Sequence, residues 1–94
     1  MRLLWTSEAL DDLADILAFY EVEAGPHTAL VVERHILDAV ESLRDFPERI
    51  RASERVPGAR ELVVYKLPYI VFVQVGKDAL HVLNVVHAAR RFPI

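Results

Sequence analysis

The chain begins with two segments whose apolar residues repeat with helical spacing. Over residues 7–24, and again from about 27 to 46, apolar positions recur at i, i+3, i+4 and i+7, which predicts two amphipathic helices. Gly25 followed by Pro26 is typical of a tight turn between helices. The expected core stripes are Ala9, Leu10, Leu13, Ile16, Leu17 and Tyr20 on the first helix and Ala29, Val32, Ile36, Ala39, Val40 and Leu43 on the second.

Shorter apolar runs predict strands on both sides of this helical hairpin. Residues 3–5 suit a short strand before Thr6, a good residue to cap the first helix. After a charged loop at 48–58, residues 60–66, 69–75 and 79 to about 87 read as three strands joined by tight turns. We therefore expect an α+β fold of order β-α-α-β-β-β, in which a three-stranded antiparallel meander carries the helices on one face.

Length and composition narrow the class of protein. Residues 1–94 fit one domain, and 53% hydrophobic with 27% charged residues is too apolar for a disordered chain. No apolar run approaches the roughly 20 residues that span a bilayer, and no secretory segment can be drawn at the start. Without cysteine, disulfides and thiol chemistry are excluded. We expect a cytoplasmic protein that makes no membrane contact.

Charge divides the chain into two unlike halves. Residues 1–45 hold ten acidic and three basic side chains, a net −7, whereas the remainder holds eight basic and four acidic side chains, a net +4. The total of −3 argues against bulk binding of nucleic acid, but it leaves a basic C-terminal half that could meet an anionic partner.

Several apolar residues of the predicted helices lie off the core stripes. They could form a surface for a partner, or they could be ordinary exposed residues that widen the core stripe, and the sequence leaves both open. These residues are Phe19, Val22, Leu30, Val31 and Leu37.

Sequence patterns for a metal ion, a nucleotide or a cofactor are missing. The histidines show no metal-binding spacing, no serine sits in a nucleophile elbow, and the three glycines are dispersed. We therefore expect no metal and no cofactor. The histidines are His27, His35, His81 and His87.

Charged and aromatic residues gather instead at the predicted strand ends. Guanidinium, imidazole and carboxyl groups on one rim of the sheet could bind phosphate and move protons, as metal-free RNA cleavage requires. The alternative is that they are surface pairs and packing residues. The residues expected to converge on this rim are Arg60, Glu61, Tyr69, His87, Arg90 and Arg91.

Three motifs follow one another in the C-terminal half. They are Gly-x-Arg-Glu-Leu at 58–62, Pro-Tyr at 68–69 and His-x-x-Arg at 87–90. Together with the amphipathic start at 5–16, they make nearly the whole chain resemble the RelE/ParE toxin superfamily. The resemblance implies a short first strand, a helical hairpin and an antiparallel sheet, in a toxin paired with a small antitoxin in a bacterial type II operon.

The superfamily has two branches, and the motifs look more like the ParE side. RelE-like members cut mRNA on the ribosome, whereas ParE-like members poison DNA gyrase. A net acidic chain with only two lysines is poorly suited to a site among ribosomal phosphates. One departure concerns the target contact: where the family often has a basic residue and a second tyrosine after Pro-Tyr, this chain has Phe72, Val73 and Gln74.

The resemblance implies partners and site residues. The expected partners are DNA gyrase and an antitoxin of the ParD-like ribbon-helix-helix class. This antitoxin would meet the basic rim with acidic residues and would alone contact operator DNA. The residues implied for the target are Arg60, Tyr69, His87, Arg90 and Arg91, and those for the antitoxin are Phe19, Val22, Leu30, Val31 and Leu37. In the alternative, a ribosome-dependent mRNA endonuclease, the catalytic residues would be Arg60, Glu61, His87 and Arg90. A decayed toxin kept as an interaction module is a third reading.

Overall fold

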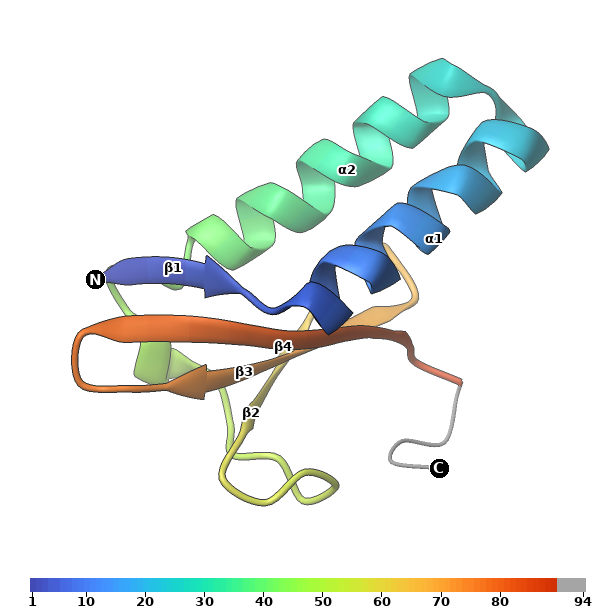
Figure 1. Cartoon of the computed structure of the whole chain (residues 1–94). Helices are drawn as coiled ribbons and strands as arrows, with labels where there is room; N and C mark the ends of the chain where they lie inside the picture. Colours follow the sequence, from blue (N-terminus) through green and yellow to red (C-terminus); the bar gives the residue numbers. More distant parts are fainter. Residues whose placement is uncertain (90–94) are drawn as a thin grey trace.

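The protein is a four-stranded sheet with a helical hairpin packed on one face (Figure 1). The computed structural model describes residues 1–89. The order β-α-α-β-β-β and the α+β class are as predicted from the sequence. The elements are β1 (Arg2–Trp5), α1 (Ser7–Ala24), α2 (Pro26–Glu41), a short 3₁₀ turn η1 (Pro47–Arg49), β2 (Arg60–Val63), β3 (Tyr69–Val75) and β4 (Ala79–His87).

The strands lie in the order β1-β4-β3-β2. The three C-terminal strands form the expected antiparallel meander, and β1 adds to the outer side of β4 in parallel. A register shift between Phe72 and Val73 marks an irregularity in the β3–β4 ladder. Because β1 ends at Trp5, opposite Val82, the last five residues of β4 have no strand on that side within residues 1–89.

Thr6 joins the start of α1 to this unpaired part of β4. Its hydroxyl accepts a hydrogen bond from the Ala9 amide at 3.1 Å, as an N-cap does, and donates one to the Leu83 carbonyl at 2.9 Å. Its own amide donates to the Val82 carbonyl at 3.0 Å. The cap residue therefore fixes where α1 leaves the sheet.

Both helices begin as predicted, but α2 ends earlier than expected. The sequence pattern extended it to about residue 46, whereas it stops at Glu41. The Leu43 and Arg44 amides bond to carbonyls three residues back, and the Ser42 hydroxyl donates to the Ala39 carbonyl at 2.6 Å. These shorter bonds tighten the chain into a turn while Leu43 stays buried, which explains why the apolar pattern continues past the helix.

The segments next to β2 also differ from the prediction. This strand ends at Val63 rather than at residue 66, because Lys66 has a φ of 67° and the chain turns there. The loop before β2 is not simply exposed: Ala52 forms an antiparallel bridge with Arg60, and Ser53 and Arg55 are half-buried. This loop lies along the outer edge of β2.

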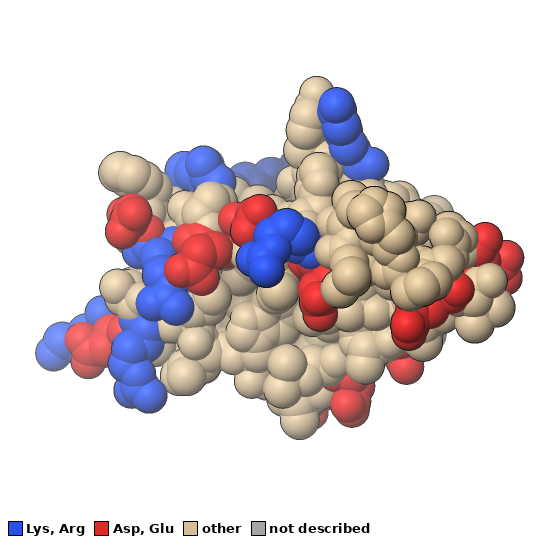
Figure 2. Space-filling model, turned by 90° about the horizontal axis from the view of Figure 1, so that it is seen from above, with Lys and Arg blue, Asp and Glu red and all other residues tan. Residues whose placement is uncertain are grey.

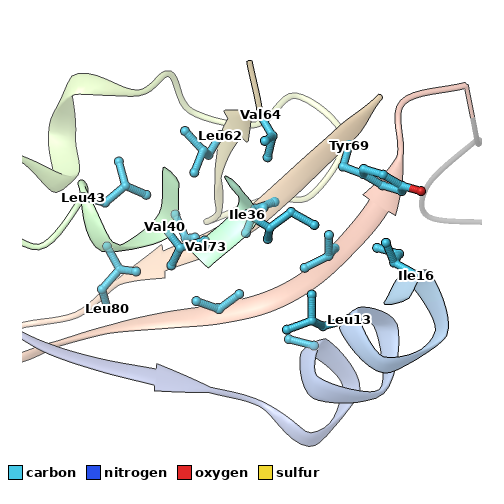
Figure 3. Packing of buried hydrophobic residues seen from close by; sticks show 14 of the residues in the cluster. Leu13, Ile16, Ile36, Val40, Leu43, Leu62, Val64, Tyr69, Val73 and Leu80 are labelled. Atoms are coloured by element: carbon cyan, nitrogen blue, oxygen red, sulfur yellow. The ribbon is translucent and has the colours of Figure 1, made fainter. Parts of the chain in front are cut away.

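The main core fills the space between the hairpin and the sheet (Figure 3). Ile36 and Val40 from α2 pack there with Leu80 and other strand residues, all fully buried. The prediction that Leu10 lies in the core is wrong, because this residue is 53% exposed. A smaller apolar cluster of Ile70, Phe72 and Val86 lies apart from this core, with Val56 of the loop packed against it.

Among residues 1–89, neither helix combines the length and the apolar content needed to cross a bilayer.

Candidate functional site

The β3–β4 ladder brings Tyr69 and His87 together. They are directly opposite each other, and their ring centroids lie 5.6 Å apart in an edge-to-face arrangement. Tyr20 of α1 packs edge-to-face on Tyr69 at 6.5 Å, and Phe19 packs on Tyr20 at 5.4 Å. Figure 3 shows Tyr69 beside Ile16 at one end of the core, with its hydroxyl group directed away from the cluster. Four rings from three elements thus form one row.

A groove runs along this row between α1 and the end of β4. We call it the aromatic groove, and its lining is Asp12, Asp15, Ile16, Phe19, Tyr20, Pro68, Tyr69, Val85, Val86 and His87. Asp12 is held in place by β4, since its Oδ2 accepts hydrogen bonds from the Val85 amide at 2.9 Å and from the Asn84 side chain at 3.2 Å. Asp15, one turn further along α1, is exposed. The groove therefore combines aromatic rings with two carboxylates.

The hydroxyl group of Tyr69 is poorly suited to lose a proton in the groove. Burial raises the pKa of its hydroxyl group, and the hydrogen bond and charge of Tyr20 raise it further. Tyr69 thus stays protonated at neutral pH and is no base. His87 is exposed, and its Nδ1 accepts a hydrogen bond from the Ala89 amide at 3.1 Å. In the neutral ring the proton is therefore on Nε2.

Arg60 and Glu61 do not join this rim, and the predicted convergence of all the candidates is wrong. Arg60 is opposite Val73, four residues along β3 from Tyr69, or about 13 Å. Its guanidinium group donates to the Ile50 carbonyl at 2.8 Å. Glu61 is opposite Phe72, so its side chain lies on the face turned away from the helices. The reason is topological: consecutive antiparallel strands begin at opposite ends of a sheet.

Glu61 is instead the centre of an internal cluster. The residue is 4% exposed, and its carboxylate accepts hydrogen bonds from Ser53 Oγ at 2.6 Å, Arg55 Nη2 at 3.2 Å and Arg51 Nη2 at 3.3 Å. Burial alone raises the pKa of this carboxyl group. The hydrogen bonds from these three residues and the charge of Arg55 outweigh burial and hold the pKa below its ordinary value of 4.5. Glu61 is therefore an engaged anion without access to the groove.

Two further candidates, Arg90 and Arg91, lie outside the described residues. The two carboxylates were not among the candidates from the sequence, Phe19 was expected only at the antitoxin contact and Tyr20 only in the core, although one signal for their grouping was available. Asp12, Asp15 and Phe19 follow one another at i, i+3 and i+7, which places them along one stripe of α1. Only the contact between α1 and β4 shows that this stripe faces Tyr69.

The apolar residues off the helix stripes are mostly exposed, as a partner surface requires. Phe19, Val22, Leu30 and Val31 are 56%, 83%, 63% and 52% exposed. Leu37 differs, because it is half-buried and packs against the core. Figure 2 shows the helix-bearing side of the molecule, where a broad uncharged surface lies beside acidic side chains toward the turn of the hairpin. We define Phe19, Val22, Leu30 and Val31 as the hairpin surface.

Comparison with known proteins identifies the family. A family model described as "ParE toxin of type II toxin-antitoxin system, parDE" matches residues 3–92. This chain belongs to the ParE toxin family. It is thus the toxin component of a type II toxin-antitoxin system, within the RelE/ParE superfamily that the motifs indicated.

Proteins related to this ParE-family toxin match its sequence or its structure over nearly its whole length. It is 36% identical over 92 residues to the putative toxin Y4kP of Sinorhizobium fredii, covering 98% of this chain and 93% of that protein. It is 34% identical over 89 residues to toxin RelE2 of Caulobacter vibrioides, covering 95% and 97%. A solved structure of the chromosomal ParDE system from P. aeruginosa superposes with a TM-score of 0.84 at 30% identity, covering 93% of this chain and 95% of that one.

Among residues 1–89 of this ParE-family toxin, no group of three or more His, Asp or Glu side chains is arranged to hold a metal ion. The aromatic groove and the hairpin surface are two candidate binding features of the described chain.

Proposed function

We propose that this ParE-family toxin inhibits growth by binding and poisoning DNA gyrase, without covalent chemistry of its own. The observation that carries the proposal is the ParE family match over residues 3–92. The name of one relative, RelE2, belongs to the other branch of the superfamily, so the relatives' names do not decide the target.

The positions of Glu61 and His87 support binding over RNA cleavage. A metal-free nuclease needs a proton acceptor and a proton donor on either side of one phosphate. Glu61 is buried among three donors and pairs with Phe72, whereas His87 pairs with Tyr69 at the start of β3. The two side chains therefore lie on different faces of the sheet and at different positions along it. The carboxylates of Asp12 and Asp15 beside His87 would also repel a phosphate group.

For the target contact we propose the end of the sheet that carries Tyr69 and His87, continued by Arg90 and Arg91 in the sequence. Arg60 lies at the start of β2, away from Tyr69 and His87, so it is a contact residue only if the target extends to that end of the strand. The two sets can be separated by single substitutions: His87→Ala should weaken inhibition if the first set binds the target, and Arg60→Ala should not.

For the antitoxin we propose a ParD-like protein that covers the hairpin surface with an amphipathic segment, as helix-in-groove recognition does. Four exposed apolar side chains on two adjacent helices support this, since such clusters usually mark a protein contact. The antitoxin would carry any contact with operator DNA.

Two assays with the purified toxin test the target. We expect loss of supercoiling by gyrase and no cleavage of mRNA in a reconstituted translation system. If cleavage is observed, Glu61→Gln tests the role of Glu61 only where circular dichroism shows the variant to be folded, because Glu61 also holds the loop before β2. Cleavage within codons would overturn the proposal in favour of a ribosome-dependent endonuclease, and silence in both assays with no growth defect would favour a decayed toxin.

A further inference from the structure

We propose that the aromatic groove holds an arginine side chain from the antitoxin. This inference rests on the proposed antitoxin partner and adds the chemistry of a second contact. The groove shares Tyr69 and His87 with the proposed target contact, so an antitoxin bound there would also block the target. A partner that covers the hairpin surface would reach the groove directly, because Phe19 belongs to both.

Charge on α1 indicates what kind of segment lies along it. The helix has six acidic residues and no basic residue. Any chain that packs along α1 therefore meets negative charge, and a basic segment is favoured over an acidic one. This reverses the expectation that the antitoxin meets this toxin with acidic residues. The acidic residues are Glu8, Asp11, Asp12, Asp15, Glu21 and Glu23.

Groove geometry favours arginine over other cations. The guanidinium group is planar, so it can stack on the face of one ring in the row of Phe19, Tyr20 and Tyr69 while its N–H groups bond to a carboxylate. Asp12 is already oriented by β4 through one oxygen, which leaves Oδ1 for a ligand. Asp15 is exposed and forms no ion pair within the described chain.

The first experiment measures antitoxin affinity by calorimetry for two toxin variants. We expect Asp15→Asn to weaken the complex about 3- to 10-fold, the size of a partly exposed charge pair. Asp11→Asn is the matched control, since it makes the same change on the same helix outside the groove lining, and we expect less than a 2-fold effect, roughly the scale of a surface substitution.

The second experiment uses small probes on the free toxin. N-acetyl-arginine amide and N-acetyl-citrulline amide differ in charge at nearly constant shape. We expect the arginine probe to shift the NMR signals of the Tyr69 and His87 rings, and the citrulline probe and inorganic phosphate to leave them unchanged. Equal shifts from both probes, or from phosphate, would overturn the arginine site.

Failure of this inference differs from failure of the antitoxin proposal. If Leu30→Asp weakens the complex but Asp15→Asn does not, the hairpin surface stands and the arginine contact is wrong. If Asp15→Asn leaves antitoxin affinity unchanged and abolishes inhibition of gyrase, the groove belongs to the target, and the assignment to the antitoxin is overturned.

Discussion

Glu61 explains at the scale of single residues why the loop before β2 lies against the sheet. Its side chain is 2% exposed, and its carboxylate binds side chains from three positions of that loop. Arg55 also lies over the Phe72 ring, 5.9 Å from its centroid, so the loop covers part of the face away from the helices. Replacing a buried anion that binds three donors is destabilising, because the donors are left without the charge that compensates them.

We predict that Glu61→Gln lowers the free energy of unfolding by about 1–3 kcal/mol, because a neutral amide accepts weaker hydrogen bonds from two arginines and presents an N–H group to one of the donors. Urea denaturation at neutral pH measures the loss. Glu54→Gln, at an exposed position of the same loop, should be nearly neutral, and equal effects of the two changes would contradict the prediction.

The same carboxyl group predicts a dependence of stability on pH. Its pKa is lower in the folded chain than its ordinary value of 4.5, so its contribution is fully present above pH 4.5 and is lost as the pH falls through the folded pKa. The stability gap between the wild type and Glu61→Gln should therefore narrow below pH 4.5. Denaturation curves at several acidic pH values would contradict this if the gap stays constant.

At the scale of secondary-structure elements, the turn between α1 and α2 depends on a single residue, Gly25. Gly25 has a φ of 93° and a ψ of 164°, a conformation that is open almost only to glycine. Its amide closes α1 on the Glu21 carbonyl, and its own carbonyl accepts from the Ala29 amide in α2. The angle between the helices, and with it the hairpin surface, follows from this conformation.

We predict that Gly25→Ala costs about 1–3 kcal/mol in the free energy of unfolding, from backbone strain alone. A Cβ atom there would meet nothing within 4 Å, so no clash contributes. Thermal or urea denaturation gives the size of the loss. D-alanine introduced at position 25 by chemical synthesis suits a positive φ and should restore most of it; an equal loss from both isomers would rule out this cause.

The hairpin surface makes its own prediction. Leu30→Asp should weaken antitoxin binding about 10-fold or more while leaving the chain folded, because Leu30 is 63% exposed. Val63→Asp is the matched control, since Val63 is 62% exposed on β2. Calorimetry and circular dichroism would separate binding from folding. Leu37→Asp is no clean test, because Leu37 packs against the core and should lose stability as well.

Most elements could be predicted because each is encoded locally. Apolar spacing, the cap at Thr6 and the Gly25-Pro26 pair predict the helices, and runs of Val, Leu and Ile predict the strands. The ends of α2 and β2 could not be predicted, because the apolar pattern continues through tight turns that stay packed on the core. Leu10 was misplaced because the spacing does not show how wide a stripe the sheet covers.

The candidate site was predicted only in part, for a geometric reason. Tyr69 and His87 start and end neighbouring antiparallel strands, and they meet. Arg60 and Glu61 also lie at the start of a strand, but β2 runs antiparallel to β3, so its start lies at the end of the sheet opposite Tyr69. Successive side chains of a strand point to opposite faces, so Arg60 and Glu61 also lie on different faces. Asp12 and Asp15 joined the groove through a helix–strand contact that no local pattern encodes.

Charge is unevenly distributed at the scale of the whole molecule. Figure 2 shows most basic side chains, with acidic ones among them, away from the turn of the hairpin on the helix-bearing side, whereas acidic side chains predominate toward the turn. Such a division orients an approaching partner before contact, and salt weakens it.

We predict that association with a basic antitoxin segment slows about tenfold between low and roughly 0.5 M salt, whereas dissociation changes little. Stopped-flow mixing at several salt concentrations measures both rates. Because α1 provides the negative field, Glu21→Gln combined with Glu23→Gln should reduce the salt effect. An association rate that is independent of salt would contradict the electrostatic account.

The parallel pairing of β1 with β4 has a consequence for how this toxin comes into being in a cell. Residues 2–5 are synthesised well before their partners, Ala79–Val82. The four-stranded sheet cannot close, and the rings of Tyr69 and His87 cannot meet, until β4 has been synthesised. A growing chain that still lacks β4 therefore has neither the four-stranded sheet nor the aromatic groove.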